Sequence, residues 1–184
     1  FYADINGDSH REGLRHRVTD IHKNGLAALE HIENKMACAR LDRLTLLAQV
    51  YPEARGGAIV SNEEVRSLIS LRPDLFFGMG SLDPGDPHLA ETAEHALGDL
   101  GLLGLALYPC AGEFRPDDPR LEPVWSLCEQ YDRPVLFHLG MTWEPGQSMA
   151  WAHPLSVEPL AMSHPKLRIG ITRFGWPWVR ETAA

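Results

Sequence analysis

The sequence has no apolar run near the 18 or so residues that a membrane-spanning helix needs, so we expect no transmembrane segment. Its first residues, Phe1 to Asp4, lack the basic start and apolar stretch of a secretory signal, and we expect a cytoplasmic protein. Only 17 basic residues stand against 25 acidic ones, which disfavours a nucleic-acid-binding surface. A small-molecule partner is therefore the expectation.

Cysteine is scarce as well. The three residues, Cys38, Cys110 and Cys128, are odd in number and far apart, which excludes a disulfide framework and a zinc knuckle. We expect them to be buried small apolar residues in a reducing compartment. With 184 residues and 44% hydrophobic content, the chain can build one sizeable core, so residues 1–184 are expected to form one domain.

Short apolar stretches that end in a polar residue, glycine or proline recur at intervals of about thirty residues, the spacing of parallel βα units. Each interval has room for one crossover helix. The expected strands cover residues 1–5, 41–50, 74–80, 102–108, 134–138 and 167–172. The expected helices cover residues 21–39, 61–72, 88–100, a segment around Trp125, and 154–162, and Ser61 with Glu64 forms a capping box.

Two closures of such a sheet compete, an open doubly wound sheet and an eight-stranded barrel. No Gly-x-Gly-x-x-Gly follows the first expected strand, and polar residues stand at the ends of several strands, so we favour the barrel. A full barrel typically needs about 250 residues. The sequence therefore predicts an α/β protein of the (β/α)8 TIM-barrel type that is incomplete, with about six βα units.

His138 ends the apolar stretch Pro134 to Leu139 just before Gly140, where a parallel strand meets its loop. Enzymes built on parallel sheets keep their reactive groups at this end of the strands. The alternative is a core histidine that bonds to a neighbouring backbone group.

Aromatic and acidic residues near the expected strand ends allow two interpretations each. Tyr108 with Cys110, and four tryptophans, could line a substrate pocket or pack in the ordinary way; the tryptophans are Trp143, Trp151, Trp176 and Trp178. Asp117 and Asp118 are expected to cap the following helix. Four histidines without ligand spacing are expected at the surface: His88, His95, His153 and His164.

The order of several segments resembles one known family. These are a histidine-bearing first strand end, SNEEV at 61–65, SLDP at 81–84, FRPDDPRLEPVW at 114–125, PVLFHLG at 134–140, and HPKLRIGITRFGWPWVRETA at 164–183. Together they are similar to the amidohydrolase-related family, the metal-dependent (β/α)8 hydrolases and decarboxylases that include aminocarboxymuconate-semialdehyde decarboxylase. The resemblance covers the chain from about Ala39 onward.

This resemblance implies a divalent metal, Zn²⁺ or Mn²⁺, held at the strand ends. In the family a His-x-His or acidic-x-His pair ends the first strand, and Asp8 and His10 stand at the matching place. The fifth strand of the family supplies another histidine ligand, which His138 matches. The alternative for Asp8 and His10 is a polar loop aspartate and a solvated histidine.

The sequence departs from the family pattern in two places. Arg173 stands where the sixth strand normally ends in a histidine; it cannot bind a cation, although it could hold a substrate carboxylate. The family's last ligand, an aspartate at the end of the eighth strand, has no counterpart, because we expect the chain to stop before the seventh.

The resemblance implies a hydrolase or decarboxylase for a small carboxylated or ring substrate. His138 and Arg173 are the catalytic candidates, and Tyr108, Trp143 and Trp176 would bind substrate. The alternative is an inactive, truncated or decayed barrel that acts as a binding or assembly module. Open sheet edges in such a barrel favour a homo-oligomer.

Overall fold

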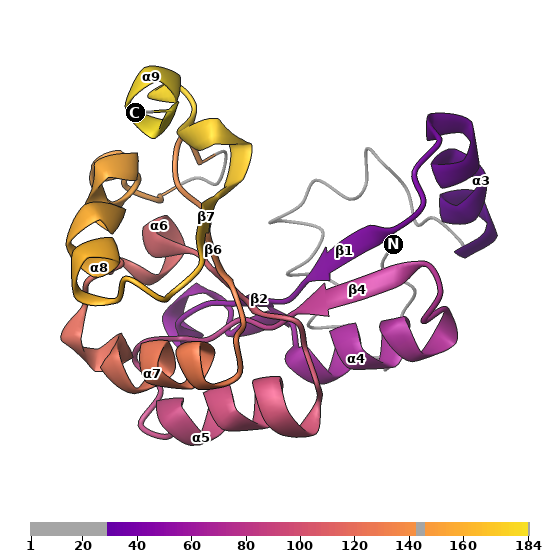
Figure 1. The fold of residues 1–184 in the computed structure, drawn as a ribbon, viewed down its shortest axis with the longest axis horizontal. Coiled ribbons are helices and arrows are strands. Elements are labelled where there is room, and N and C mark those ends of the chain that lie inside the picture. Colours follow the sequence, from indigo (N-terminus) through magenta and orange to yellow (C-terminus); the bar gives the residue numbers. More distant parts are fainter. Residues whose placement is uncertain (1–28, 143–145, 184) are drawn as a thin grey trace.

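A computed structural model describes residues 29–142 and 146–183 of the chain (Figure 1). Its centre is a curved parallel sheet with the strand order β1-β4-β5-β6-β7. The strands are β1 Leu44–Leu47, β4 Phe76–Met79, β5 Leu105–Leu107, β6 Val135–Phe137 and β7 Ile169–Ile171. The predicted incomplete barrel is thereby confirmed for these five strands, and the expected first strand lies outside the described residues.

Parallel pairing fixes which residues stand side by side. Leu47 of β1 pairs with Met79 of β4, and a single bridge from Gly80 to Leu105 joins β4 to β5. The three strands β5, β6 and β7 are in a common register that runs Leu107, Phe137, Ile171 at their last residues. The carboxyl ends of all five strands therefore lie along one rim.

Helices follow the strands and cover the outer face of the sheet, as α4, α5, α7 and α8 do in Figure 1. The longer helices are α3 Leu29–Ala39, α4 Asn62–Leu71, α5 Leu89–Glu94, α7 Glu122–Gln130 and α8 Glu158–Ser163. Shorter helical segments are η1 Glu53–Arg55, η2 His95–Asp99, α6 Pro109–Gly112, η3 Pro119–Leu121, η4 Met149–Trp151, η5 Pro154–Val157, η6 Thr172–Gly175 and α9 Val179–Ala183. Among the helices of the described ranges, none is long and apolar enough to cross a membrane.

Local signals in the sequence set several of these boundaries. The capping box at the start of α4 is confirmed: the Ser61 hydroxyl accepts from the Glu64 amide, and the Glu64 carboxylate accepts from the Ser61 amide. Asp118 caps η3 as expected by accepting from the Arg120 amide. The expected helix over 88–100 forms α5 and then continues as the π-helical η2 up to Gly101, whose φ is +61°.

The single strand expected over 41–50 was wrong in its second half. After β1 the chain turns into β2, Gln49–Val50, which pairs in antiparallel fashion with β3, Ala58–Val60. Two consecutive glycines with positive φ, Gly56 and Gly57, let the chain reverse between them. This small hairpin stands at the carboxyl end of β1.

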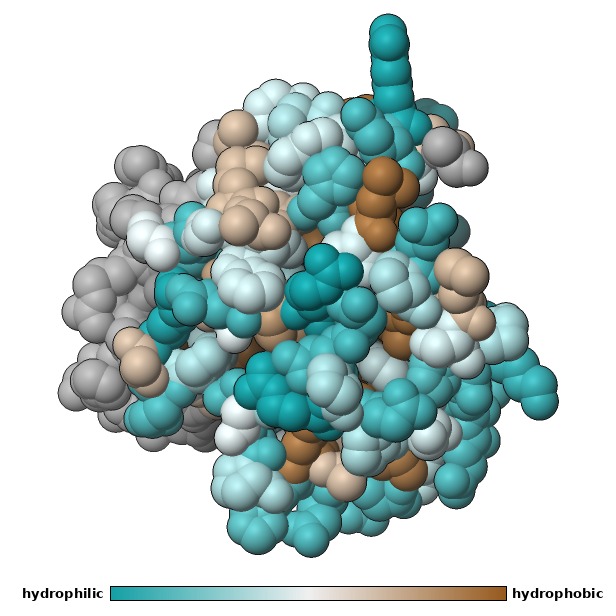
Figure 2. Space-filling model, turned by 90° about the vertical axis from the view of Figure 1, so that its left-hand side faces the viewer, coloured by the Kyte–Doolittle hydropathy of each residue, from teal (hydrophilic) through white to brown (hydrophobic). Residues whose placement is uncertain are grey.

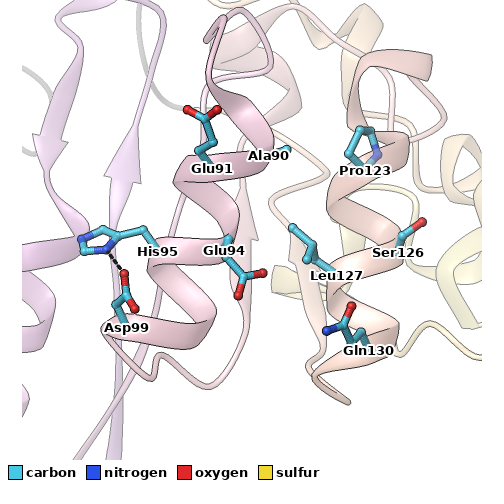
Figure 3. A pocket seen from close by; sticks show the side chains of 9 residues that line it. All are labelled: Ala90, Glu91, Glu94, His95, Asp99, Pro123, Ser126, Leu127 and Gln130. Atoms are coloured by element: carbon cyan, nitrogen blue, oxygen red, sulfur yellow. Dashed lines mark hydrogen bonds and ion pairs between the residues drawn. The ribbon is translucent and has the colours of Figure 1, made fainter.

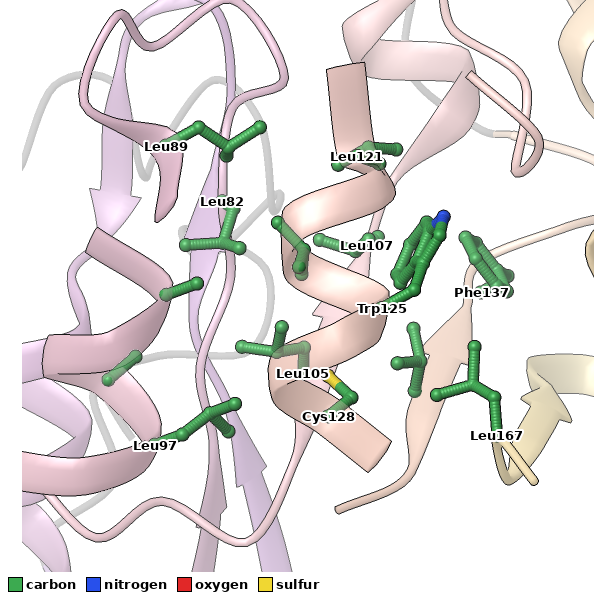
Figure 4. Packing of buried hydrophobic residues seen from close by; sticks show 14 of the residues in the cluster. Leu82, Leu89, Leu97, Leu105, Leu107, Leu121, Trp125, Cys128, Phe137 and Leu167 are labelled. Carbon is green, nitrogen blue, oxygen red and sulfur yellow. The ribbon is translucent and has the colours of Figure 1, made fainter. Parts of the chain in front are cut away.

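The main core lies between the sheet and the helices (Figure 4). The Trp125 ring of α7 packs edge-on against Phe137 of β6, with ring centroids 5.8 Å apart. Leu105 and Leu107 of β5 belong to the same cluster. Roughly 1.5–3 kcal/mol for each fully buried side chain of this size makes this layer the main stabilising one.

Two expectations about exposure were wrong. Cys38 is exposed, whereas Cys110 and Cys128 are buried as predicted. His164 was expected at the surface but is only 9% exposed, because α8 packs beside α7 and places its ring between Glu122 and Glu129. Position in sequence did not reveal either contact.

The solvent face of the helical layer is mostly hydrophilic. Figure 2, which views the left-hand side of Figure 1, shows hydrophobic residues that are scattered among polar ones rather than joined into one patch. Met162 of α8, at 77% exposed, is among the large apolar side chains in solvent. Isolated apolar residues of this kind are normal on protein surfaces.

Candidate active site at the carboxyl ends of the strands

His138 points to the inner, concave face of the sheet. The preceding residue, Phe137, packs outward on Trp125, and successive side chains of a strand alternate between faces. The strand ladder still includes His138, because its amide donates to the Leu107 carbonyl at 2.8 Å. The imidazole thus stands at the end of β6 where barrel enzymes keep their reactive groups.

The same alternation places other polar side chains on this face. Ala48, Leu107 and Ile171 pack with the outer core, so the residues after them face inward. The inner-face residues that follow the strands are Gln49, Ser81, Tyr108, His138 and Thr172. Four of the five, all but His138, carry a neutral group that can both donate and accept hydrogen bonds.

Three rings form a row across this rim. The rings of Tyr108 and His138 lie 5.4 Å apart, and the Tyr51 ring meets Tyr108 edge-on at 5.5 Å. The Tyr108 hydroxyl donates to the Ala48 carbonyl at 2.8 Å, which ties the end of β5 to the end of β1. Tyr108, predicted to bind substrate, therefore lies beside His138 and is 7% exposed.

Electrostatics keeps the His138 ring neutral. Burial, followed by the positive charge of Arg173, lowers the pKa of His138 to about 4. Its Nδ1 lies 3.4 Å from the Thr172 hydroxyl of the neighbouring strand end. A neutral imidazole has a lone pair on one ring nitrogen, which suits it to bind a metal or accept a proton.

The described residues fit a metal only in part. A neutral His138 on the inner face is a suitable ligand. Within residues 29–142 and 146–183, no three His, Cys, Asp or Glu side chains gather closely enough to hold an ion. The other predicted ligands, Asp8 and His10, lie outside the described residues.

Arg173 follows Thr172 immediately after β7. Its φ of +55° begins a left-handed turn that continues through Phe174 and Gly175. A non-glycine residue in this conformation is uncommon and is often found at functional sites. The side chain is exposed, and its charge still lowers the pKa of His138.

The predicted tryptophans do not share one place. Trp143 lies outside the described residues, and Trp176 is 49% exposed in the loop after β7. The backbone of Trp176 meets the loop after β6, since its carbonyl accepts from the Met141 amide at 2.6 Å. Trp178 instead packs on His153, with ring centroids 5.0 Å apart.

Arg55 joins three of the loops above the rim, which its isolated position in the sequence did not suggest. It forms an ion pair with Glu113 from the loop after β5 and donates to the Gly146 carbonyl at 3.3 Å from the loop after β6. Sequence reasoning also missed Gln49, Ser81 and Thr172 at the rim. Their signal was available, a polar residue just after the last apolar residue of each strand.

Two cavities lie near these elements. One of about 310 Å³ lies at the ends of β2 and β4 and is lined by Tyr51, Asn62, Ser81 and Asp83 among others. A larger one of about 570 Å³ lies between α5 with η2 and α7 in the outer helical layer, where Glu94 and Leu127 point into the gap (Figure 3). Only the smaller one is at the strand ends, where the reactive rim lies.

Comparison with known proteins agrees with this geometry. A family model described as amidohydrolase matches residues 40–184, and no curated protein matches the chain. An uncharacterised TIM-barrel protein, Bb4693 from Bordetella bronchiseptica, is similar at a TM-score of 0.72 and 22% identity, covering 95% of this chain and 60% of that one.

Two decarboxylases have the same fold. The 2,6-dihydroxybenzoate decarboxylase from Rhizobium is similar at a TM-score of 0.64 and 20% identity, covering 94% of this chain and 61% of that one. The 5-carboxyvanillate decarboxylase of Novosphingobium aromaticivorans, complexed with manganese, is similar at a TM-score of 0.65 and 19% identity, covering 90% and 56%. This chain thus spans about 60% of the length of the structures it resembles.

Strand order, the polar rim and a family match over most of the chain agree, and the chain belongs to the amidohydrolase family.

Proposed function

We propose that this protein is a metal-dependent hydrolase or decarboxylase acting on a small carboxylated or ring substrate. The observation that carries the proposal is a neutral imidazole, His138, on the inner face at the carboxyl end of β6. Family membership supports the same reaction classes, and two of the structurally similar proteins are decarboxylases. The substrate itself belongs to the proposal.

Asp8, His10 and His138 would hold the metal in this proposal. Zn²⁺ and Mn²⁺ both suit such a set of nitrogen and oxygen ligands, and one similar decarboxylase is complexed with manganese. A bound divalent ion lowers the pKa of coordinated water and polarises a substrate oxygen. The low pKa of His138 supports its role, because a protonated imidazole cannot be a ligand.

Arg173 would hold the carboxylate of the substrate. Its guanidinium stays protonated and offers two parallel donors to a carboxylate. Tyr108 supplies an aromatic wall beside His138, and Trp143 and Trp176 would supply others. In this arrangement the substrate anion lies near β7 and its ring faces Tyr108.

The second candidate is a barrel that binds small molecules or assembles with further copies without catalysing a reaction. Arg173 favours it, because a fixed positive charge near His138 opposes cation binding. Self-association would cover sheet edges, and β7 pairs only with β6 among the described strands.

Metal content per chain tests the proposal. We expect the purified protein to take up about one Zn²⁺ or Mn²⁺, and His138→Ala to lose it. His88→Ala is the matched control, since that histidine is exposed and bonds to Glu91. No uptake at near-millimolar metal, either in the natural protein or after Arg173→His, would contradict the enzyme and favour the second candidate.

A further inference from the structure

Two buried polar atoms at the rim have no hydrogen-bond partner among the described residues. They are Oε1 of Gln49, after β1, and Oγ of Ser81, after β4. Ser81 is completely buried, at 0% exposed. An unsatisfied buried polar group costs on the order of 1–3 kcal/mol, so each such atom in a native protein calls for an occupant.

Both atoms belong to the inner face of the sheet. Gly80 faces outward, since a Cβ there would meet Leu102 and Ala96 of the outer layer, and Ser81 therefore faces inward. Ala48 packs in the outer core, and Gln49 alternates with it.

The two residues are also neighbours across the sheet. Leu47 pairs with Met79, and the Ala48 amide donates to the Met79 carbonyl at 2.9 Å. Two residues further along each strand, this register brings Gln49 beside Ser81. The two unpartnered atoms therefore come from adjacent strand ends rather than from unrelated parts of the fold.

Ser81 is held firmly in this place. The buried Asn62 side chain accepts from the Ser81 amide at 2.8 Å and donates to the Ser81 carbonyl at 3.2 Å. Asn62 is itself the first residue of α4, next to the capping box of Ser61. The backbone of Ser81 is thus fully satisfied, and only its hydroxyl is left without a partner.

Ser81 lines the 310 Å³ cavity at the rim, and the other polar groups around that cavity are mainly acceptors. They include the carboxylates of Glu53, Asp83 and Asp86. Tyr51 borders the same cavity and packs on Tyr108, which packs on His138. The cavity is therefore separated from His138 by two rings.

We propose that Gln49 and Ser81 form a subsite for a hydrogen-bond-donating substituent of the substrate, a hydroxyl or amino group. This rests on the proposed function. The carboxamide oxygen of Gln49 only accepts, and nearby carboxylates repel anions, so the subsite selects a donor and rejects a second carboxylate. The substrate then lies with its carboxylate toward Arg173 and its donor group toward β1 and β4.

Equilibrium binding of substituted benzoates to the protein tests this inference without needing turnover. The probes are benzoate and its 3- and 4-hydroxy, 3- and 4-amino, and 3- and 4-methoxy derivatives, measured by calorimetry. None of these substituents can chelate a metal together with the carboxylate. We expect a hydroxy- or aminobenzoate to bind about tenfold more tightly than benzoate and the methoxy analogue, the effect of one buried hydrogen bond.

Ser81→Ala and Gln49→Met remove the two atoms with little change in volume. We expect each to reduce that preference to about twofold while the affinity for benzoate itself stays the same. Ser156→Ala is the matched control, because Ser156 has a buried, unpartnered hydroxyl in η5, away from the rim. Thermal unfolding of each variant verifies that it is folded.

The outcomes separate the two proposals. Benzoate binding without a donor preference, a preference that survives both substitutions, or an equal loss for all ligands would overturn the subsite and leave the proposed function intact. The last two results would indicate buried water or a purely structural role for Ser81 and Gln49. Failure of every benzoate to bind the natural protein would refute the proposed carboxylate site and the subsite with it.

Discussion

Substituting Gly140 by alanine should destabilise the protein by bringing two loops of the rim into collision. Gly140 follows His138 and Leu139 with a φ of +96°, and a Cβ there would lie 2.6 Å from the Trp176 carbonyl oxygen and 2.8 Å from the Gly175 carbonyl carbon. These are backbone atoms, which cannot rotate away. The loops are also joined by a hydrogen bond from Met141 to Trp176.

Gly101→Ala is the control that isolates the collision. Gly101 has a φ of +61°, and a Cβ there would meet nothing within 4 Å. We expect about 1–2 kcal/mol from the left-handed backbone in either variant. Gly140→Ala should lose roughly 1–3 kcal/mol more, because the added methyl overpacks the contact.

Equilibrium urea unfolding measures the difference between the two variants. A lower midpoint at an unchanged slope reports lost stability rather than a changed unfolded state. If both variants lose the same free energy within about 0.5 kcal/mol, the close approach of the loops after β6 and β7 is not as the structure has it. A larger loss for Gly101→Ala would contradict the reasoning entirely.

Three further predictions concern single groups. The low folded pKa of His138 makes the metal-free protein fully stabilised by this group above pH 6.5 and less stable as pH falls toward 4, because the unfolded chain is protonated first, with a slope of up to about 1.4 kcal/mol per pH unit; urea midpoints from pH 7.5 to 4.5 should drop less in His138→Gln, and Arg173→Ala should raise the imidazole pKa in an NMR titration. Exposed Cys38 should react with a thiol reagent at pH 8 before unfolding, whereas Cys128, whose pKa burial raises to about 12, should react only after it; rapid labelling of the Cys38→Ser variant would refute this. Ser61→Ala should cost about 1 kcal/mol in urea unfolding through loss of the capping box, and no change would show that the cap contributes nothing.

Local patterns in the sequence anticipated much of the fold. The recurrence of apolar stretches predicted a parallel sheet, and β4 to β7 lie within the expected strands. The start of α4 was readable because a capping box satisfies backbone donors within four residues. His138 was identified for the same kind of reason, since its place between an apolar strand and Gly140 is a local property.

Contacts between distant segments were not readable in this way. The pairing of β2 with β3 depends on a turn that Gly56 and Gly57 permit but do not require. The burial of His164 depends on how α8 packs beside α7. Arg55 looked like an isolated turn residue, yet it binds two other loops.

The sequence by itself determined that this chain builds parallel βα units and that His138 ends one of them, because alternation and capping act between residues close together in the chain. Only the tertiary structure decided that Arg173 lowers the pKa of His138 and that Gln49 lies beside Ser81. The reason is physical: desolvation, charge interactions and unsatisfied hydrogen bonds depend on distances through space, which are set only when the strands are aligned.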